Sequence, residues 1–217
     1  METAPQSPPP NSKQRLLDAA LHVIRSKGYV ATTVDDLCAT AGVTKGSFFH
    51  HFKSKEELAL AAVDYWNVMT GGLFAQAPYQ LPADPRDRVL GYIDFRAEIL
   101  QGELPDFTCL LGTMVQETFE THPRIRDACN AGIAVHAHTV AIDMAAAKAI
   151  YAPDAAWDPE TLALYTQAVL QGAFILAKAQ GSATIAARCV EQLRNHVATL
   201  LNPPAAPVNS RIREKQT

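Results

Sequence analysis

The sequence predicts an all-α fold, in which an N-terminal three-helix module with a helix-turn-helix precedes a larger helical domain. Apolar residues recur at helical spacing through most of the chain. Strand signals, such as a sustained alternation of apolar and polar residues or an Asn-Gly hairpin, are nearly absent. Proline, glycine and N-capping residues separate the apolar periods, and they stand where helices would begin or end.

Four helices are expected near the N-terminus. They cover residues 12–27, 34–41, 44–50 and about 54–73. Thr33 with Asp36, and Ser54 with Glu57, place a hydroxyl and an acid three positions apart, the spacing that caps a helix N-terminus. Gly42 would end the second helix, because glycine adopts the positive φ that such an end often requires. These four periods make the first part of the chain the best defined by its sequence.

Longer helical patterns follow, with prolines between most of them. They lie near residues 85–102, 106–121, 124–150, 158–180 and 182–201. Residues 1–11 and 202–217 are Pro-rich or polar and lack a core pattern, so we expect disordered tails there. The sequence thus divides into an N-terminal module at 12–57 and a helical domain at 58–201.

The composition excludes several classes of protein. The chain has 217 residues, is 48% apolar and has a net charge of −3, so it is long enough for a large core and is not a polycation. Its four cysteines are scattered without zinc-ligand spacing, which favours free thiols. The first residues have no basic end and no apolar run, and no apolar stretch approaches the roughly 20 residues of a membrane span. We therefore expect a cytoplasmic protein without a membrane partner.

The closely spaced second and third helices predict DNA binding. Two short helices joined by a turn with glycine form a helix-turn-helix, and the later helix, 44–50, would enter the major groove. Thr33 and Thr44 place hydroxyls at helix N-termini, which attract phosphates; the alternative is that both only cap their helices, and the two roles are compatible. Between Ser12 and Glu57 basic residues outnumber acidic ones by seven to five, a sign that suits nucleic acid.

Three motifs in this segment are specific for one family. They are K-G-Y-x-x-T-T-V-D-D-L from Lys27, A-x-A-G-V-T-K-G-S-F from Ala39 and F-x-H-F-K-S-K-E-E-L from Phe49. In this order, between Ser12 and Leu58, they resemble the TetR family of bacterial one-component transcriptional regulators. The resemblance implies a homodimer whose two modules bind successive major grooves of a partly palindromic operator. It also implies a helical ligand-binding and dimerisation domain, and a repressor that a small ligand releases from double-stranded operator DNA.

The resemblance also implies particular DNA contacts. Carried over position by position, they fall on Thr33, Thr44, Lys45, Ser47, Phe48, Phe49, His50 and Lys55. One position departs from the family, which usually has Tyr where this chain has Phe49, so the phosphate hydrogen bond of that hydroxyl is lost. Lys55 is expected to hold a phosphate. Of the neighbouring His50 and His51, one is expected to face DNA and the other to pack inside.

Candidate ligand-binding residues mix aromatic, flexible and polar side chains on the middle helices. They are Trp66, Met69, Phe74, Tyr92, Phe95, Met114 and Glu117. Ligand pockets are mainly apolar with a few polar groups, but ordinary core packing is the alternative for each residue. The high apolar content weakly favours a hydrophobic effector. Cys109 has no basic neighbour in sequence to favour its thiolate, and Asp106 opposes it, which argues against a redox-sensing thiol.

The last two long helices are expected to form the dimer. Helices near 158–180 and 182–201 have more apolar residues than one buried face needs, as in a permanent dimer interface; a helical hairpin within a monomer is the alternative. No catalytic motif or metal-ligand spacing is present, so we expect neither an enzyme nor a metal or cofactor. Rival functions are an activator, a regulator without a small-molecule effector, a protein–protein adaptor and an enzyme that retains a helix-turn-helix.

Overall fold

The computed structural model describes residues 11–202, and this part of the chain is helical without any strand. Its helices are α1 (Ser12–Lys27), α2 (Val34–Ala41), α3 (Lys45–His51), α4 (Lys55–Ala75), α5 (Pro85–Glu98), α6 (Leu104–Phe107), α7 (Leu110–Thr118), α8 (Pro123–Tyr151), α9 (Pro159–Gln180) and α10 (Thr184–Leu200), with a short 3-10 helix at Pro78–Gln80. The all-α prediction is confirmed. The predicted tails at 1–11 and 202–217 lie outside the described residues, except for Asn11 and Asn202.

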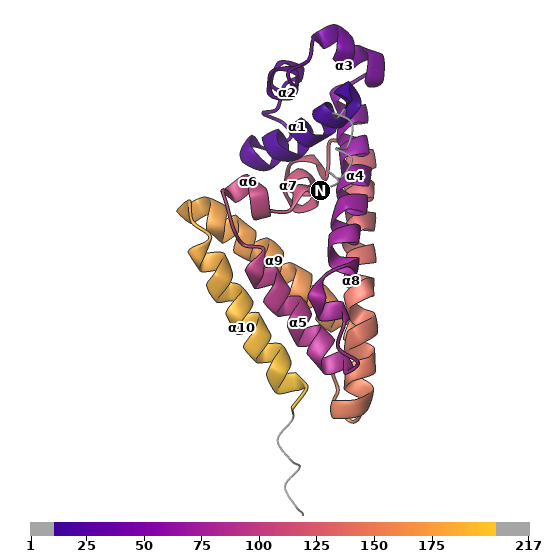
Figure 1. Ribbon diagram of the computed structural model, residues 1–217, viewed down its shortest axis with the longest axis vertical. Helices are drawn as coiled ribbons and strands as arrows, with labels where there is room; N and C mark the ends of the chain where they lie inside the picture. Colours follow the sequence, from indigo (N-terminus) through magenta and orange to yellow (C-terminus); the bar gives the residue numbers. More distant parts are fainter. Residues whose placement is uncertain (1–10, 203–217) are drawn as a thin grey trace, which may run out of the picture.

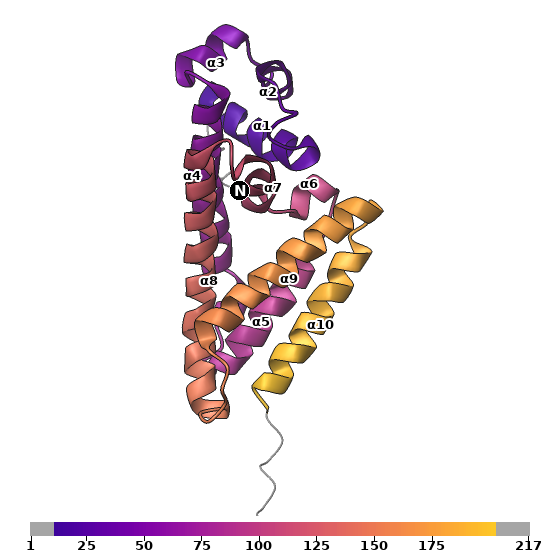
Figure 2. The ribbon, with the colours of Figure 1, turned by 180° about the vertical axis from the view of Figure 1, so that it is seen from behind.

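The helices form an elongated arrangement with the module at one end (Figure 1). Helices α1, α2 and α3 lie together, and α4 leads from them into the body, where it runs beside α8. The body contains α5, α8, α9 and α10, and α9 packs against both α8 and α10 (Figure 2). Helices α6 and α7 lie between the two parts and contact α1. Helix α4 is therefore the continuous connection along the chain, whereas α6 and α7 make a second contact through space.

The helix expected over residues 106–121 is wrong, because α6 and α7 are separate. Thr108 has extended backbone angles, with φ −80° and ψ 154°, and Cys109 then begins α7. The break leaves backbone carbonyls without helical partners. Arg25 of α1 donates to two of them, the carbonyls of Asp106 (3.1 Å) and Thr108 (3.4 Å). A contact from a distant helix thus stabilises a break that local apolar spacing did not indicate.

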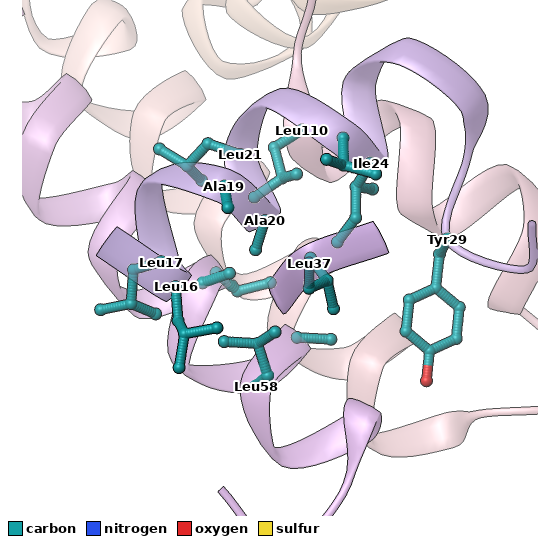
Figure 3. Close-up of a cluster of buried hydrophobic side chains, with 14 of the residues drawn as sticks. Leu16, Leu17, Ala19, Ala20, Leu21, Ile24, Tyr29, Leu37, Leu58 and Leu110 are labelled. Carbon is teal, nitrogen blue, oxygen red and sulfur yellow. The ribbon is translucent and has the colours of Figure 1, made fainter. Parts of the chain in front are cut away.

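One hydrophobic cluster joins the module to the body. It includes Leu16 and Ile24 of α1, Leu37 of α2 and Leu58 of α4, and also Leu110 of α7. Figure 3 shows these side chains around a common centre. Residues of α7 and α8, including Met114 and Ile125, complete the cluster. The sequence boundary expected between residues 57 and 58 therefore lies inside one continuous core.

A second cluster fills the body. It gathers side chains of α5, α8, α9 and α10, among them Tyr92, Met144, Leu170 and Val190. Each of these four is almost completely buried. The burial of large apolar side chains on several helices stabilises the body by removing apolar surface from water.

Two helices differ from the expectation that no segment has the length and composition of a membrane span. Among the described residues, α8 and α9 are each long and apolar enough to cross a membrane by those criteria alone. Both helices contribute to the second cluster, with Met144 on α8 and Leu170 on α9. A core helix of a folded domain passes the same test, so this finding is weak evidence for a membrane span.

Candidate DNA-binding surface and ligand cavity

Two threonines begin the helices of the helix-turn-helix. Thr33 Oγ1 accepts a hydrogen bond from the backbone N–H of Asp36 (3.1 Å), and the Asp36 carboxylate accepts one from the N–H of Thr33 (2.8 Å). Thr44 Oγ1 accepts from the N–H of Ser47 (3.1 Å) at the start of α3. Between the helices, Gly42 has a φ of 63°, a value that favours glycine. Both threonines are caps, and both remain exposed beside free backbone N–H groups.

Helix α1 is tied to α2 by a short ion pair. Lys27 Nζ lies 2.6 Å from Asp36 Oδ2. Hydrogen bonds from Lys27 and Thr33 hold the pKa of the Asp36 carboxyl far below its usual range. The carboxylate therefore stays charged at neutral pH, and the first turn of α2 keeps its cap.

The exposed start of α3 has one cation. Lys45 Nζ lies 2.8 Å from Asp35 Oδ1 of α2, and this interaction raises the pKa of Lys45. Both side chains are more than 60% exposed, so the pair is weak and can open without a large cost. Gly46 has no side chain, and Phe49 and His50 are exposed further along the same helix. This end of α3 can therefore approach a nucleic acid closely.

Two of the residues that are predicted to contact DNA make contacts within the protein instead. Phe48 is completely buried, where it packs in the core of the module. Lys55 Nζ donates to the carbonyls of Tyr29 (3.0 Å) and Thr32 (2.9 Å) and lies 4.3 Å from the centre of the Tyr29 ring. Burial lowers its pKa. In this conformation the Lys55 ammonium holds the loop between α1 and α2, and its neighbour Lys53 is the exposed cation at the start of α4.

The two neighbouring histidines differ as expected in their exposure. His50 is exposed, whereas His51 is half-buried and its Nε2 lies 2.7 Å from Ser12 Oγ. Ser47 is half-buried, and the Phe49 ring is 56% exposed. Phe49 thus presents an apolar ring to the outside, at the position where a tyrosine hydroxyl is missing.

A cavity lies in the body between α4, α5, α7, α8 and α9. Its empty space is about 680 Å³ when open solvent is included, and about 90 Å³ of that is room for the centres of water-sized molecules, so the enclosed cavity is small. Trp66 and Phe74, both predicted, line it. The sequence reasoning missed the polar lining, which consists of Asn67, Thr70, Arg96, His136, Gln167 and Gln171. Gln167 and Gln171 are four positions apart on an apolar helix, a signal that indicates a shared polar face.

The other predicted ligand residues do not line this cavity. Met114 is completely buried in the first cluster, and Met69 is 40% exposed on α4. Tyr92 lines a smaller adjacent space, and Phe95 packs against the second cluster. Glu117 lines an adjoining groove next to α9, which shares Cys109, Gln171 and Phe174 with the cavity. For Met114 and Phe95, core packing is what the structure shows.

A chain of hydrogen bonds crosses the wall of the cavity. Gln167 Nε2 donates to the Tyr92 hydroxyl (3.1 Å), which lies 3.0 Å from His136 Nε2. Since the hydroxyl accepts the bond from Gln167, it donates its own hydrogen to His136 Nε2, which is the acceptor. Burial, together with the charge of Arg96, lowers the pKa of His136 to about 4. His136 is therefore neutral at physiological pH, with its ring proton on Nδ1.

Arg25 connects the cavity to the module. Besides the carbonyls that precede α7, its guanidinium contacts the ring of Trp66, with 5.0 Å between Cζ and the ring centroid. Trp66, Phe107 and Cys109 all line the cavity. Arg25 of α1 thus contacts Trp66 of the cavity wall directly, and it binds the segment that contains Phe107.

Glu117 of α7 makes a second connection between the body and the module. Its Oε2 accepts a hydrogen bond from the backbone N–H of Val30 (2.8 Å), in the loop between α1 and α2. Gly28 in the same loop has a φ of 88°, and a Cβ there would lie 2.0 Å from Glu117 Oε1. The loop therefore fits closely against α7.

The described residues contain no group of three or more His, Cys, Asp or Glu side chains able to hold a metal ion. The four cysteines are free, with Cys38 and Cys129 buried and Cys109 and Cys189 half-buried. Burial raises the pKa of Cys129 to about 12 and also raises that of Cys38. These two thiols stay protonated at neutral pH.

Two family models match the chain. Residues 16–62 match the N-terminal domain described as "Bacterial regulatory proteins, tetR family". Residues 85–192 match "Transcriptional regulator LmrA/YxaF-like, C-terminal domain". The first covers the helix-turn-helix, and the second covers most of the body that encloses the cavity.

Relatives and solved structures agree with these matches. The chain is 38% identical over 93 residues to the transcriptional regulator BetI of Rhizobium meliloti, which is 41% of this chain and 44% of BetI. It is 42% identical over 57 residues to the transcriptional repressor KstR2 of Mycolicibacterium smegmatis, covering 25% and 28% of the two chains. These matches span less than half of either relative. The regulatory protein TetR from Rhodobacter sphaeroides superimposes with a TM-score of 0.76 at 25% identity, over 85% of this chain and 98% of that one.

Proposed function

Because the chain belongs to the TetR family of bacterial regulatory proteins, which are DNA-binding transcription regulators rather than enzymes, we propose that it is a ligand-released repressor. It binds operator DNA as a homodimer in the bacterial cytoplasm. A small molecule in the cavity between α4, α5, α7, α8 and α9 lowers its affinity for that DNA. The KstR2 relative is itself described as a repressor, which supports this sign of regulation.

The contacts of Arg25 are the observation that carries the proposal. Its guanidinium contacts both Trp66 and the segment before α7, two parts of the cavity wall, while its own backbone belongs to α1 of the module. A ligand that displaces Trp66 or Phe107 therefore acts directly on the position of α1. Ligand binding shifts the population of module positions only if the ligand has a higher affinity for one of them.

Two modules of a dimer must fit half-sites about 34–36 Å apart. Because α4 runs from the module into the cavity wall, a tilt of this helix changes the separation of the two modules. The ligand is proposed to favour a tilt in which the modules no longer match successive major grooves. The affinity for the operator then falls even though the module itself stays folded.

The DNA-binding surface is proposed to comprise the exposed ends of the helix-turn-helix. Thr33 and Thr44 lie at helix N-termini, where free N–H groups attract phosphate. Lys45, Phe49 and His50 extend along the outward side of α3. Lys53 is added as a phosphate contact, since Lys55 is bound to loop carbonyls and Phe48 is buried.

The dimer is proposed to form through the outward apolar stripe of α9, with the adjacent α10. Leu164, Tyr165, Ile175 and Leu176 are each at least 44% exposed. They repeat at helical spacing around Gly172. A Cβ added to Gly172 would have no other atom within 4 Å, so this position is open. Such an exposed apolar stripe is costly in water and suits a partner helix. The outward positions of α10 are mainly polar, so α9 contributes most of the apolar contact.

The proposal is tested by fluorescence anisotropy with labelled DNA from upstream of the chain's own gene. The purified protein is titrated at low and near-physiological salt, with a scrambled duplex of the same composition as the control. We expect tight, salt-dependent binding to the upstream duplex alone. Lys45→Ala should weaken binding and reduce the salt slope by about one unit, the effect of one lost phosphate contact.

If both duplexes bind equally weakly, the next experiment is a selection of binding sequences from a random DNA pool. Failure to enrich any sequence contradicts the DNA-binding function and favours the adaptor alternative. A reporter driven by the upstream DNA then gives the sign of regulation. Deletion of the gene should raise expression; a fall would show that the protein is an activator.

A further inference from the structure

Arg96 of α5 brings a positive charge to the wall of the cavity. Its guanidinium lies between two aromatic rings, 5.2 Å from the centroid of Phe74 and 5.8 Å from that of Phe174. All three residues line the cavity. Stacking of this kind orients a planar guanidinium, but it leaves the N–H donors in the plane of the group free for other partners.

Arg96 has no counter-ion among the described residues. Its Nε is buried and has no hydrogen-bond partner there. The carboxylates of the neighbouring helix positions are already paired elsewhere, Asp94 of α5 with Arg194 (2.5 Å) and Asp143 of α8 with Arg88 (2.8 Å). A buried donor that lacks a partner has a free-energy cost, which an acceptor from outside the chain removes.

The rest of the cavity wall is mainly apolar. Trp66, Leu73, Leu111 and Ile133 line it together with the two phenyl rings beside Arg96. A fully hydrated inorganic anion would gain little from these side chains. A ligand with an apolar body and a single anionic group would fit both the apolar lining and the Arg96 guanidinium.

Neutral polar groups lie near the same rings. The His136 ring packs on Phe74, with 4.7 Å between ring centroids, so His136 and Arg96 contact the same phenyl group. The Tyr92 hydroxyl is hydrogen-bonded to His136 Nε2, and no group among the described residues is hydrogen-bonded to His136 Nδ1. Because the pKa of His136 is lowered to about 4, the ring adds a donor without a second positive charge. The cavity thus has one cation, which matches one negative charge.

We propose that the cavity binds a small monocarboxylate with an apolar body, and that the carboxylate pairs with Arg96 while the body lies against Trp66 and the phenyl rings. This inference rests on the proposed ligand-responsive function and adds the chemical class of the ligand. The guanidinium fork matches a carboxylate in geometry and can bind both of its oxygens. Arg96 is therefore the residue that distinguishes an acid from its neutral amide.

Isothermal titration calorimetry tests the proposal with matched pairs of probes. The pairs are 4-phenylbutyrate with 4-phenylbutanamide, and octanoate with octanamide, each differing only in the charged group. We expect the full-length protein to bind the better acid about tenfold to a hundredfold more tightly than its amide, the range for a hydrogen bond to a charged group. Equal affinities within both pairs, or no binding of either acid at millimolar concentration, would overturn the proposal.

Three variants assign the preference to Arg96. Arg96→Gln should abolish it, and Arg96→Lys, which keeps the charge, should retain part of it. Arg86→Gln is the matched control, since Arg86 also has a buried unpartnered Nε and stacks on an aromatic ring, that of Tyr151 at 5.2 Å, but lies outside the cavity lining. An acid preference that survives in Arg96→Gln, with the fold verified by circular dichroism, contradicts the proposal.

DNA binding is measured separately in the presence of each probe. A carboxylate that binds in the calorimeter through Arg96 but leaves the operator complex intact supports the ligand class and contradicts release by this ligand. If the unsubstituted protein shows no acid preference but binds the operator normally, the ligand class alone is contradicted. The two proposals therefore fail in different measurements.

Discussion

Glu117 of α7 accepts a hydrogen bond from the backbone N–H of Val30, 2.8 Å away, so the body holds the loop between α1 and α2. We expect Glu117→Ala to increase hydrogen exchange at the Val30 amide, because this N–H loses its acceptor. Since Glu117 is exposed, the free energy of unfolding should change by only about 1 kcal/mol or less. Exchange monitored by NMR checks this, with Glu120→Ala, another exposed glutamate just after α7, as the control. Unchanged exchange at Val30 would remove Glu117 from this role.

Gly28 allows the same loop to approach α7. Gly28→Ala should lower the free energy of unfolding by more than Gly181→Ala. Both alanines would have a positive φ: the left-handed angles at position 181 cost an alanine about 1–2 kcal/mol, whereas the angles at position 28 (φ 88°, ψ 162°) lie in a region almost confined to glycine. Only the Cβ at position 28 would also overlap Glu117, whereas nothing lies within 4 Å of a Cβ at 181. Urea unfolding of both variants measures the difference, and equal losses would show that the loop adjusts freely.

Lys55 and Lys53 should respond differently to the loss of their charge. Lys55→Met removes the donor to the carbonyls of Tyr29 and Thr32, so we expect it to destabilise the protein by about 1–3 kcal/mol. Lys53→Met should leave stability within about 0.5 kcal/mol, because Lys53 is exposed. Its proposed phosphate contact predicts a smaller salt slope of DNA binding. Thermal unfolding measures the stability of both variants, and anisotropy measures their salt slopes of DNA binding. The reverse pattern would assign the phosphate contact to Lys55.

His136 should make stability depend on pH below neutrality. Its pKa is lowered to about 4 in the folded protein, against about 6.5 in an unfolded chain. Between these values the unfolded state binds more protons, so stability falls as pH is lowered from about 6.5 towards 4, by at most about 1.4 kcal/mol per pH unit. His136→Gln should flatten this part of the profile. Denaturant unfolding at several pH values checks it, and identical profiles would assign the dependence to other groups.

The α9 stripe should control the oligomeric state. Ile175→Glu places a charge in the middle of the proposed interface, where an unpaired carboxylate would be desolvated, so we expect monomers at micromolar concentration. Gln192→Glu, on the exposed polar side of α10, should remain dimeric. Light scattering coupled to size-exclusion chromatography distinguishes the two. A dimer that persists in Ile175→Glu would move the interface to another face.

Local signals were sufficient for the first helices, and insufficient for the break before α7 and for the cavity. The cap at Thr33 and the glycine at position 42 act within a few residues, so α2 has the bounds that the sequence predicts, and Ser54 likewise caps α4. The break at Thr108 depends on Arg25, which lies more than eighty positions earlier. The spacing of apolar residues near Thr108 does not indicate this contact. The same limit applies to Arg96, whose partners Phe74 and Phe174 come from two other helices.

The DNA-binding candidates show a related limit. A family motif identifies positions but not the conformation of each side chain, and Phe48 is a core residue within the motif. Lys55 is long enough to reach either outward or back to the loop, and the loop carbonyls are its partners in this structure. Trp66 and Phe74 were found because large aromatic residues on the middle helices are common in pocket walls.

The hydrophobic cluster that joins α1, α4, α7 and α8 has a consequence for engineering. A fragment that ends near residue 58 would keep Leu16 and Ile24 but lose Leu110, Met114 and Ile125 of the same cluster, so its core would be incomplete. Chimeric regulators that exchange only the first helices would therefore combine unmatched surfaces. A transplant that also carries the contacting residues of α7 and the first turns of α8 would preserve the packing, and with it the specificity of the donor for its own DNA sequence.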